Sequence, residues 1–210
     1  MDMVDIPWPD LGSFSQENVK VPLKEDYKFE DMWYLDTEAA SPIFKTQADI
    51  IKSNQSKGIV DVGCRHGPVL DYLTHDFKYM GFDTSQEPID VARNNWKDHS
   101  NIEFRCESWN DAECFFVDFD VDQVIWSGVL LYRPDDHFDF FDKITNKLYS
   151  SPNAIIQEPM PWQRHWKAGL ILNTIADSME EYKDAYKEFK EYKLDLDIFA
   201  GRRLVADVTL

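Results

Sequence analysis

The sequence predicts an α/β protein built on a mostly parallel, seven-stranded β-sheet that ends in an antiparallel hairpin. Short apolar runs rich in β-branched residues alternate with amphipathic segments along the chain, which is typical of strand–helix–strand units. Near the C-terminus, two alternating runs flank Ala200 and Gly201, which indicates a hairpin around a glycine turn. The chain has 210 residues, of which 43% are hydrophobic, and this fits one α/β domain with a substantial core.

The elements are expected in a regular order. Residues 1–54 are predicted to form an N-terminal arm and a helical cap, with a helical pattern over Glu30–Ser53 that Pro42 divides, and residues 55–210 the sheet domain. Trp33, Phe44, Ile50 and Ile51 are expected to be buried. The predicted strands are Ile59–Val62, Lys78–Asp83, Asn101–Cys106, Val121–Ser127, Asn153–Gln157, Leu194–Phe199 and Arg202–Leu210. The predicted helices are a segment that starts at Pro68, then Ser85–Trp96 with Ser85 as N-cap, Trp109–Phe116, Pro134–Tyr149 and Gln163–Tyr192.

The junction between the first strand and the segment after it contains the most informative residues. Asp61 lies at the carboxyl end of the strand, and Gly63 and Gly67 mark a tight loop. Pro68 then suits the first position of a helix, where the N–H that it lacks has no helical partner. A strand, a glycine loop and a helix in this order bring backbone N–H groups close to a bound nucleotide.

A second acidic residue ends the next predicted strand. Asp83 follows Asp61 by about 20 residues, the length of one strand–helix–strand unit, and a carboxylate there can accept two hydrogen bonds from a ribose diol. The glycines do not follow the G-x-G-x-x-G spacing, which disfavours a nicotinamide-dependent dehydrogenase.

The pattern D-x-G-x-x-x-G, followed by a strand that ends in GFD, resembles the class I S-adenosylmethionine-dependent methyltransferases. The first motif of that family is usually D/E-x-G-x-G-x-G, and Arg65 stands here where the middle glycine would be. The resemblance implies a Rossmann-like fold, S-adenosyl-L-methionine as the cofactor and methyl transfer as the reaction. It also implies that the N-terminal helical segment covers the ligand pocket, with Trp33 and Tyr34 either in a lid or packed against the sheet.

The resemblance also implies which residues hold the cofactor. Asp61 would orient the glycine loop and meet the amino group, and Asp83 would bind the ribose. Glu107 and Ser108 would contact adenine, while Ser127 would line the methionine side. The residues that we expect to hold the cofactor are Asp61, Gly63, Cys64, Arg65, Gly67, Asp83, Thr84, Glu107, Ser108, Trp109 and Ser127.

Methyl transfer needs a nucleophile placed in line with the methyl carbon and sometimes a base that removes its proton. Glu158 and His165 are the candidate bases, and Tyr132 could orient the acceptor. The segment QEPMPWQRHW, residues 157–166, resembles the EPQPW-like segment of Bin3-type enzymes, which methylate an RNA 5′ phosphate. We expect it to form a wall of the acceptor pocket.

The charge of the chain restricts the acceptor. The net charge is −17, with 22 Lys and Arg against 39 Asp and Glu, and such a surface repels phosphate backbones. We therefore expect a small-molecule acceptor methylated on oxygen or nitrogen, and no extended nucleic acid. A Bin3-like RNA 5′-phosphate methyltransferase and a non-catalytic cofactor-binding partner subunit remain alternatives. Asp135, Asp136 and His137 suit the start of a helix better than a metal site, so no metal is expected.

The remaining features concern location and assembly. Cys64, Cys106 and Cys114 form no C-x-x-C pair and are expected to be reduced thiols of a cytoplasmic protein. No apolar run reaches the length needed to cross a membrane, and the N-terminus has no signal-peptide pattern. The aromatic content of the N-terminal arm and of the late helix is consistent with a homodimer.

Overall fold

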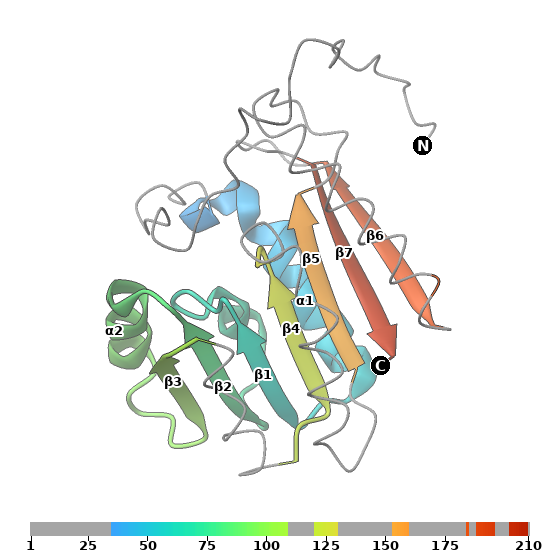
Figure 1. The fold of residues 1–210 in the computed structure, drawn as a ribbon. Coiled ribbons are helices and arrows are strands. Elements are labelled where there is room, and N and C mark those ends of the chain that lie inside the picture. Colours follow the sequence, from blue (N-terminus) through green and yellow to red (C-terminus); the bar gives the residue numbers. More distant parts are fainter. Residues whose placement is uncertain are drawn as a thin grey trace, which may run out of the picture.

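The protein is described by a computed structural model, which covers residues 35–108, 120–129, 153–159, 184, 188–195 and 202–209. Seven strands form one sheet in these residues (Figure 1). The strands are β1 (Gly58–Val62), β2 (Lys78–Asp83), β3 (Ile102–Cys106), β4 (Gln123–Ser127), β5 (Asn153–Pro159), β6 (Phe189–Asp195) and β7 (Arg202–Thr209). The helices are the α-helices α1 (Ser41–Asn54) and α2 (Gln86–Asn95) and the short 3-10 helices η5 (Glu38–Ala40) and η6 (Pro68–Tyr72).

The sheet order is β3-β2-β1-β4-β5-β7-β6. β2 and β3 are added on one side of β1 and the later strands on its other side, so the strand order changes next to β1. β1 pairs in parallel with β2 on one side and with β4 on the other. β7 is antiparallel to both β5 and β6, so it is the one reversed strand. This confirms the predicted α/β fold with its C-terminal hairpin. In open sheets of this kind, ligands bind beyond the carboxyl ends of the strands where the order changes.

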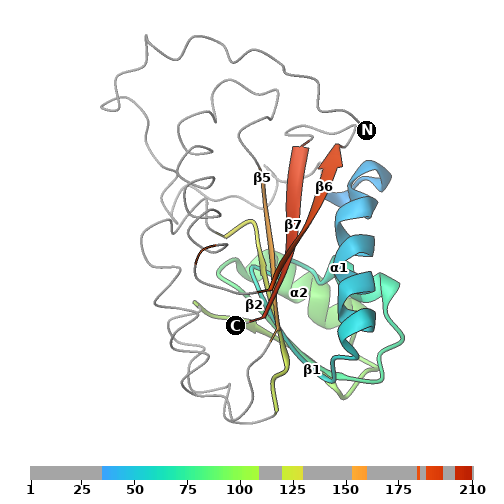
Figure 2. The same cartoon turned by 90° about the vertical axis from the view of Figure 1, so that its right-hand side faces the viewer.

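One apolar core joins the helices to the sheet. α1 and α2 lie on the same face of the sheet (Figure 2). Burial of each large aliphatic side chain there stabilises the fold by about 1.5–3 kcal/mol. The core combines Ala48, Ile50 and Ile51 of α1, Val69 and Leu70 of η6, and Ile89 and Ala92 of α2 with Ile59, Tyr79, Phe104, Ile125, Ile155 and Val205 of the strands.

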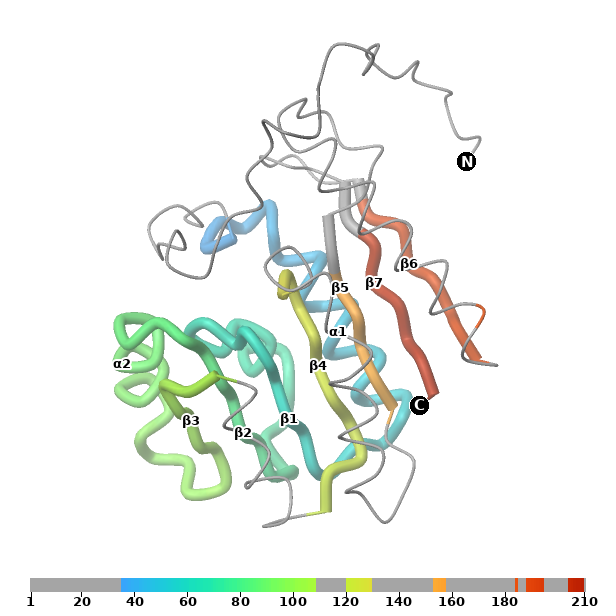
Figure 3. The backbone as a smooth tube through the Cα atoms, in the orientation of Figure 1, coloured from blue at the N-terminus to red at the C-terminus, as the bar shows by residue number. Residues whose placement is uncertain are grey.

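Helix α1 runs from the carboxyl edge of the sheet toward its amino edge (Figure 3). It starts at Ser41, with Pro42 in its first turn, and ends at Asn54, after which the C-cap residue Gln55 has a left-handed backbone with φ 56°. Pro42 therefore begins this helix after the separate 3-10 turn η5, as its effect on the helical pattern predicts. The expected burial of Phe44, Ile50 and Ile51 is confirmed. Trp33 and Tyr34 lie outside the described residues, and the division at residue 54 remains a prediction.

The prediction of a helix that continues to Tyr192 is wrong. Phe189–Asp195 is the edge strand β6, and its backbone pairs with β7 over seven residues. In this strand Tyr192 and Leu194 pack against the core, while Lys193 between them is exposed. Sheet pairing and packing thus override the helical pattern of the local sequence. The first strand of the hairpin, predicted over Leu194–Phe199, therefore starts five residues earlier than expected, at Phe189.

Other elements differ only at their ends. The helix expected after Pro68 is a single 3-10 segment, since Leu73 is already extended and His75 is left-handed with φ 60°. β4 starts at Gln123 rather than Val121, and β5 continues to Pro159, two residues beyond the prediction. Ser85 is the N-cap residue of α2, as expected. Trp109–Phe116 and Pro134–Tyr149 lie outside the described residues. In the part of the chain that is described, no helix is long and apolar enough to cross a membrane.

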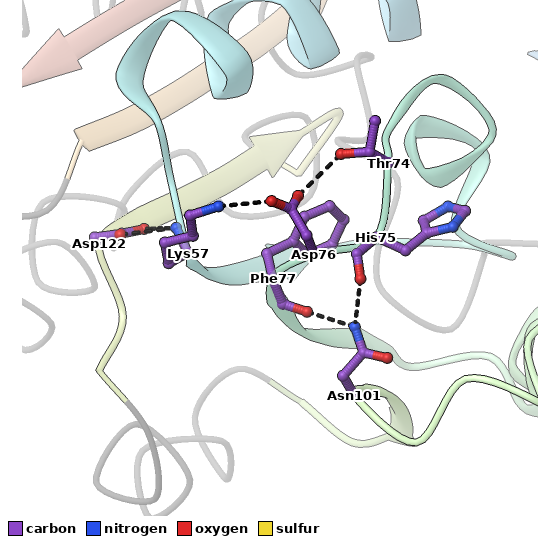
Figure 4. A network of polar contacts seen from close by, with 7 residues as sticks. All are labelled: Lys57, Thr74, His75, Asp76, Phe77, Asn101 and Asp122. Atoms are coloured by element: carbon purple, nitrogen blue, oxygen red, sulfur yellow. Dashed lines mark hydrogen bonds and ion pairs between the residues drawn. The ribbon is translucent and has the colours of Figure 1, made fainter.

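A polar network ties down the amino edge of the sheet (Figure 4). The carboxylate of Asp122 accepts hydrogen bonds from the backbone N–H of Lys57 at 2.8 Å and of Gly58 at 3.1 Å. The ammonium of Lys57 lies 2.8 Å from Asp76, which also accepts from the Thr74 hydroxyl at 2.9 Å. These contacts join the start of β1 to the loops before β2 and β4. They leave the carboxylates well supplied with donors.

Candidate functional site

The loop after β1 is shaped by three residues with positive φ. Gly63, Arg65 and Gly67 have φ values of 75°, 52° and 77°. The backbone N–H groups of Gly63 and Cys64 both donate to the carbonyl of Phe82, at 2.8 and 2.9 Å, which fixes the loop over the end of β2. A Cβ atom on Gly63 would lie 2.7 Å from the Val129 side chain, so only glycine fits there. The loop brings backbone close to the carboxyl edge, as the sequence predicts.

Asp83, the last residue of β2, is held against this loop. Its side chain is 5% exposed, and its Oδ2 accepts a hydrogen bond from the backbone N–H of Arg65 at 3.0 Å. Oδ1 accepts from the backbone N–H of Ser85 at 2.9 Å. Burial raises the pKa of Asp83, whereas these N–H donors and the positive charge of Arg65 act against the rise. Two fixed donors leave further lone pairs of this carboxylate for a ligand.

Asp61 of β1 is the second buried acid. It is 4% exposed and accepts a hydrogen bond from the Tyr79 hydroxyl at 2.7 Å. Asp61 pairs in register with Gly81, which has no side chain, and the Sγ of Cys64 occupies the space beside it. Burial raises the pKa of Asp61 to about 7, although the bond from Tyr79 lowers it and the nearby Asp83 adds to the rise. This carboxyl group can therefore gain or lose a proton near neutral pH.

A chain of uncharged polar side chains joins α1 to β4 and β5. Nε2 of Gln47 donates to the hydroxyl of Ser127 at 3.2 Å, and this hydroxyl donates to Oε1 of Gln157 at 2.7 Å. Gln47 is 2% exposed although it lies in a helix, because its amide has this partner. The three residues present hydroxyl and amide groups, but no charge, at the carboxyl ends of β4 and β5.

A cavity opens between these groups. It brings together five of the residues expected from the sequence, namely Asp61, Gly63, Cys64, Arg65 and Ser127. Its wall is completed by Leu35, Phe44, Gln47, Pro68, Val69, Gly128 and Gln157.

Arg65 is the cation of this cavity. Its side chain is 8% exposed, and its guanidinium forms a two-point contact with Asp36, with Nη1–Oδ1 at 3.1 Å and Nη2–Oδ2 at 3.2 Å. Asp36 lies just before η5, so this contact ties the segment that precedes α1 to the loop after β1. Nδ1 of His66 lies 3.8 Å from the same carboxylate, and burial together with Arg65 lowers the pKa of His66.

The remaining predicted site residues lie around the cavity or outside the described part. Gly67 fixes the loop, Thr84 is exposed beyond β2, and Glu107 and Ser108 follow β3. Oε2 of Glu107 is shielded from solvent and has no hydrogen-bond partner in the described residues. Glu158 is the penultimate residue of β5, but its side chain is not described. Trp109, Tyr132 and His165 lie outside the described residues. No group of three or more metal-ligating side chains is present in the residues described.

Sequence reasoning missed several residues of the site. Gln47 lines the cavity, Tyr79 holds Asp61, and Asp36 holds Arg65. Gln47 could have been found, because it is a polar residue between Phe44 and Ile51 on the apolar stripe of a helix. Gln157, which also lines the cavity, was expected only as part of the segment 157–166 and not as a residue of its own. No comparable signal identifies Asp36.

Residues 59–150 match a family model that is described as a methyltransferase domain. The match starts in β1 and includes the glycine loop, Asp61 and Asp83. Together with the fold, it confirms the resemblance to the class I S-adenosylmethionine-dependent methyltransferases.

Solved structures of methyltransferases share the fold of this chain. The N-methyltransferase NodS from Bradyrhizobium japonicum WM9 matches with a TM-score of 0.60 and 16% identity, over 83% of this chain and 98% of that one. The methyltransferase domain of bacterial CtHen1-C gives 0.58 and 16%, over 82% and 99%. An rRNA methylase from Streptococcus thermophilus gives 0.54 and 13%, over 78% and 93%. At these identities the likeness shows the fold alone.

Proposed function

We propose that this protein transfers a methyl group from S-adenosyl-L-methionine to an oxygen or nitrogen of a small-molecule acceptor. The observation that carries the proposal is the position of Asp83 at the end of β2. Its buried carboxylate is anchored to the backbone of the loop after β1, beside a cavity lined by Asp61, Arg65 and Ser127. A carboxylate at this place suits a ribose diol.

The donor groups of the site fit the cofactor part by part. Asp83 would accept hydrogen bonds from the ribose hydroxyls, with Thr84 beside it. Glu107 would accept from the exocyclic amine of adenine, and its shielded Oε2, which has no hydrogen-bond partner among the described residues, supports this role. Asp61 would meet the ammonium group of the methionine part, and the backbone at Gly63 leaves room for close approach. The cofactor supplies an activated methyl group on a sulfonium sulfur.

The residues on the acceptor side are proposed from sequence position. Glu158 or His165 would take the proton from the acceptor, and Tyr132 would orient it. The uncharged chain of Gln47, Ser127 and Gln157 faces the cavity and suits a polar acceptor better than a polyanion. The net charge of −17 also supports a small molecule rather than nucleic acid as substrate.

Location and assembly are part of the same proposal. The two cysteines within the described residues, Cys64 and Cys106, are free thiols, which supports a reducing compartment such as the cytoplasm. A homodimer is proposed from the aromatic content of the N-terminal arm and the late helix, and analytical ultracentrifugation would test it.

Calorimetric titration of the full chain with S-adenosylmethionine tests the proposed function. We expect saturable binding with one site per chain, followed by release of S-adenosylhomocysteine when a suitable acceptor from a metabolite panel is added. Binding without turnover on a broad panel that includes RNA 5′-phosphate ends would favour the non-catalytic partner subunit. Absence of binding to either form of the cofactor would contradict the proposal.

A further inference from the structure

Arg65 stands where the family motif has a glycine, and it is one of the residues that line the cavity. Of the described residues that line the cavity, Arg65 alone carries a positive charge, and Asp61 alone can carry a negative one. A free amino acid end of a ligand carries one charge of each sign. The cavity therefore has one complementary partner for each of them.

The contact between Arg65 and Asp36 already shows how a carboxylate sits on this guanidinium. Nη2 of Arg65 donates a hydrogen bond to Oδ2 of Asp36 at 3.2 Å, and Nη1 lies 3.1 Å from Oδ1 in the same ion pair. The neighbour of Asp36, Leu35, lines the same cavity. Asp36 thus holds the guanidinium at the border of the ligand space.

The two partners differ in burial, and this difference decides which one can leave. The Asp36 side chain is 42% exposed, whereas the Arg65 side chain is 8% exposed. Asp36 can move into water without losing much hydration, whereas the guanidinium of Arg65 is buried and is stabilised by a carboxylate beside it. An exchange of one carboxylate for another keeps Arg65 paired throughout.

We propose that Arg65 binds the carboxylate of the cofactor's amino acid end, and that Asp36 pairs with Arg65 until that carboxylate displaces it. The inference rests on the proposed function, because it concerns the same cofactor. Binding of the amino acid end would then release the segment Leu35–Ala40 from the loop after β1. The adenosine end, which contacts Asp83 and Glu107, would not have this effect.

Two ligands separate the ends of the cofactor in a binding experiment. S-adenosylhomocysteine carries the amino acid end, whereas 5′-methylthioadenosine has the adenosine and a thioether sulfur but no carboxylate or ammonium. In the variant Asp36→Asn, Arg65 loses its competing carboxylate. We expect S-adenosylhomocysteine to bind about threefold to tenfold more tightly, and 5′-methylthioadenosine to bind as it does to the wild type.

Matched variants show whether the effect belongs to this contact. Asp49→Asn removes an equal charge from an exposed position of α1, where Asp49 pairs with Lys52, and should change neither affinity. Arg65→Lys keeps the charge but has only one nitrogen to place against a carboxylate. It should lower the affinity for S-adenosylhomocysteine about tenfold and leave the affinity for 5′-methylthioadenosine unchanged. Thermal unfolding of each variant confirms that it is folded.

Hydrogen exchange of the wild type gives a second measurement that needs no substitution. S-adenosylhomocysteine should speed the exchange of amides in residues 36–40, and 5′-methylthioadenosine should not.

The titrations can overturn the inference in two ways. If Asp36→Asn lowered the affinity for both ligands, Asp36 would stabilise the bound state and the inference would be wrong. Unchanged affinities in Asp36→Asn would overturn it as well, while wild-type binding of both ligands would leave the proposed function standing. Failure of the wild type to bind either ligand would instead count against the proposed function.

Discussion

Both edges of the sheet carry aspartates, but the surroundings of the aspartates differ between the two edges and shift their pKa values in opposite directions. At the amino edge, Asp76 and Asp122 are supplied with donors, and the contacts from Lys57 and Thr74 lower the pKa of Asp76 (Figure 4). At the carboxyl edge, burial raises the pKa values of Asp61 and Asp83. The first pair joins loops at low energetic cost. The second pair also has fixed donors, but it is kept out of water, and burial outweighs those donors. This is typical of groups that bind a ligand.

The largest expected effect concerns Asp83 at the carboxyl edge. In Asp83→Asn, the side chain cannot accept hydrogen bonds from two ribose hydroxyls and from Arg65 N–H at once. We expect the affinity for S-adenosylhomocysteine to fall about 100-fold, or about 2.7 kcal/mol, as measured by calorimetry. The control Asp90→Asn removes a charge from the exposed face of α2, where Asp90 accepts from Gln86. If Asp83→Asn bound S-adenosylhomocysteine with wild-type affinity, Asp83 would not be the residue that binds the ribose hydroxyls.

The opposite pattern is expected for Asp122 at the amino edge. Asp122→Ala leaves the backbone N–H groups of Lys57 and Gly58 without their acceptor, and should lower the free energy of unfolding by about 1–2 kcal/mol. Affinity for S-adenosylhomocysteine should not change. Urea denaturation and calorimetry measure the two quantities, and Asp76→Ala should lower stability less because its ion pair is exposed. A large loss of affinity in Asp122→Ala would mean that the two edges are not separate in function.

The smallest expected effect is a pH dependence at Asp61. Its pKa of about 7 in the folded state lies above the ordinary value of 3.8, so the folded state holds the extra proton between these values. Its contribution to the free energy of unfolding therefore falls as pH rises from about 4 to about 7. Affinity for a ligand ammonium should instead rise with pH up to about 7 and then level off.

Tyr79→Phe sharpens this prediction. The Tyr79 hydroxyl lowers the pKa of Asp61, so its loss should move the midpoint of the affinity curve to higher pH. Asp61→Asn should flatten the curve, and calorimetric titrations from pH 5.5 to 8.5 (about the range in which histidine also titrates) would compare all three proteins. If the affinity of the wild type did not depend on pH, Asp61 would not be the residue that binds the ligand ammonium.

The sequence predicts the sheet and the acids at its carboxyl edge because both depend on local patterns. A short apolar run marks a buried strand, and the carboxyl end of a parallel strand lies at a known edge, so Asp61 and Asp83 could be placed without a structure. The partner of Arg65 could not, because Asp36 reaches it from a separate segment before α1. Gln47 likewise meets Ser127 only after α1 packs on the sheet.

The error at the C-terminal end has a related cause. The spacing of aromatic residues before Lys193 favours a helix when the segment is considered alone, but β7 offers an edge with which it pairs. Such pairing cannot be inferred from the segment itself. The same distinction holds for Tyr79, whose contact with Asp61 depends on the register of β1 and β2.

The hydrogen bonds at Ser127 run in one direction, since its oxygen accepts from Gln47 and its proton goes to Gln157. The hydroxyl therefore has only a lone pair left for a third partner. A molecule that contacts Ser127 must donate an N–H or O–H. An ether or ketone oxygen placed there would face the lone pair of the hydroxyl, which repels it. Selectivity at this wall is thus set by proton direction. It would be inverted if the amide of Gln157 alone turned over, because both glutamines would then donate to the hydroxyl and leave its proton for the third partner.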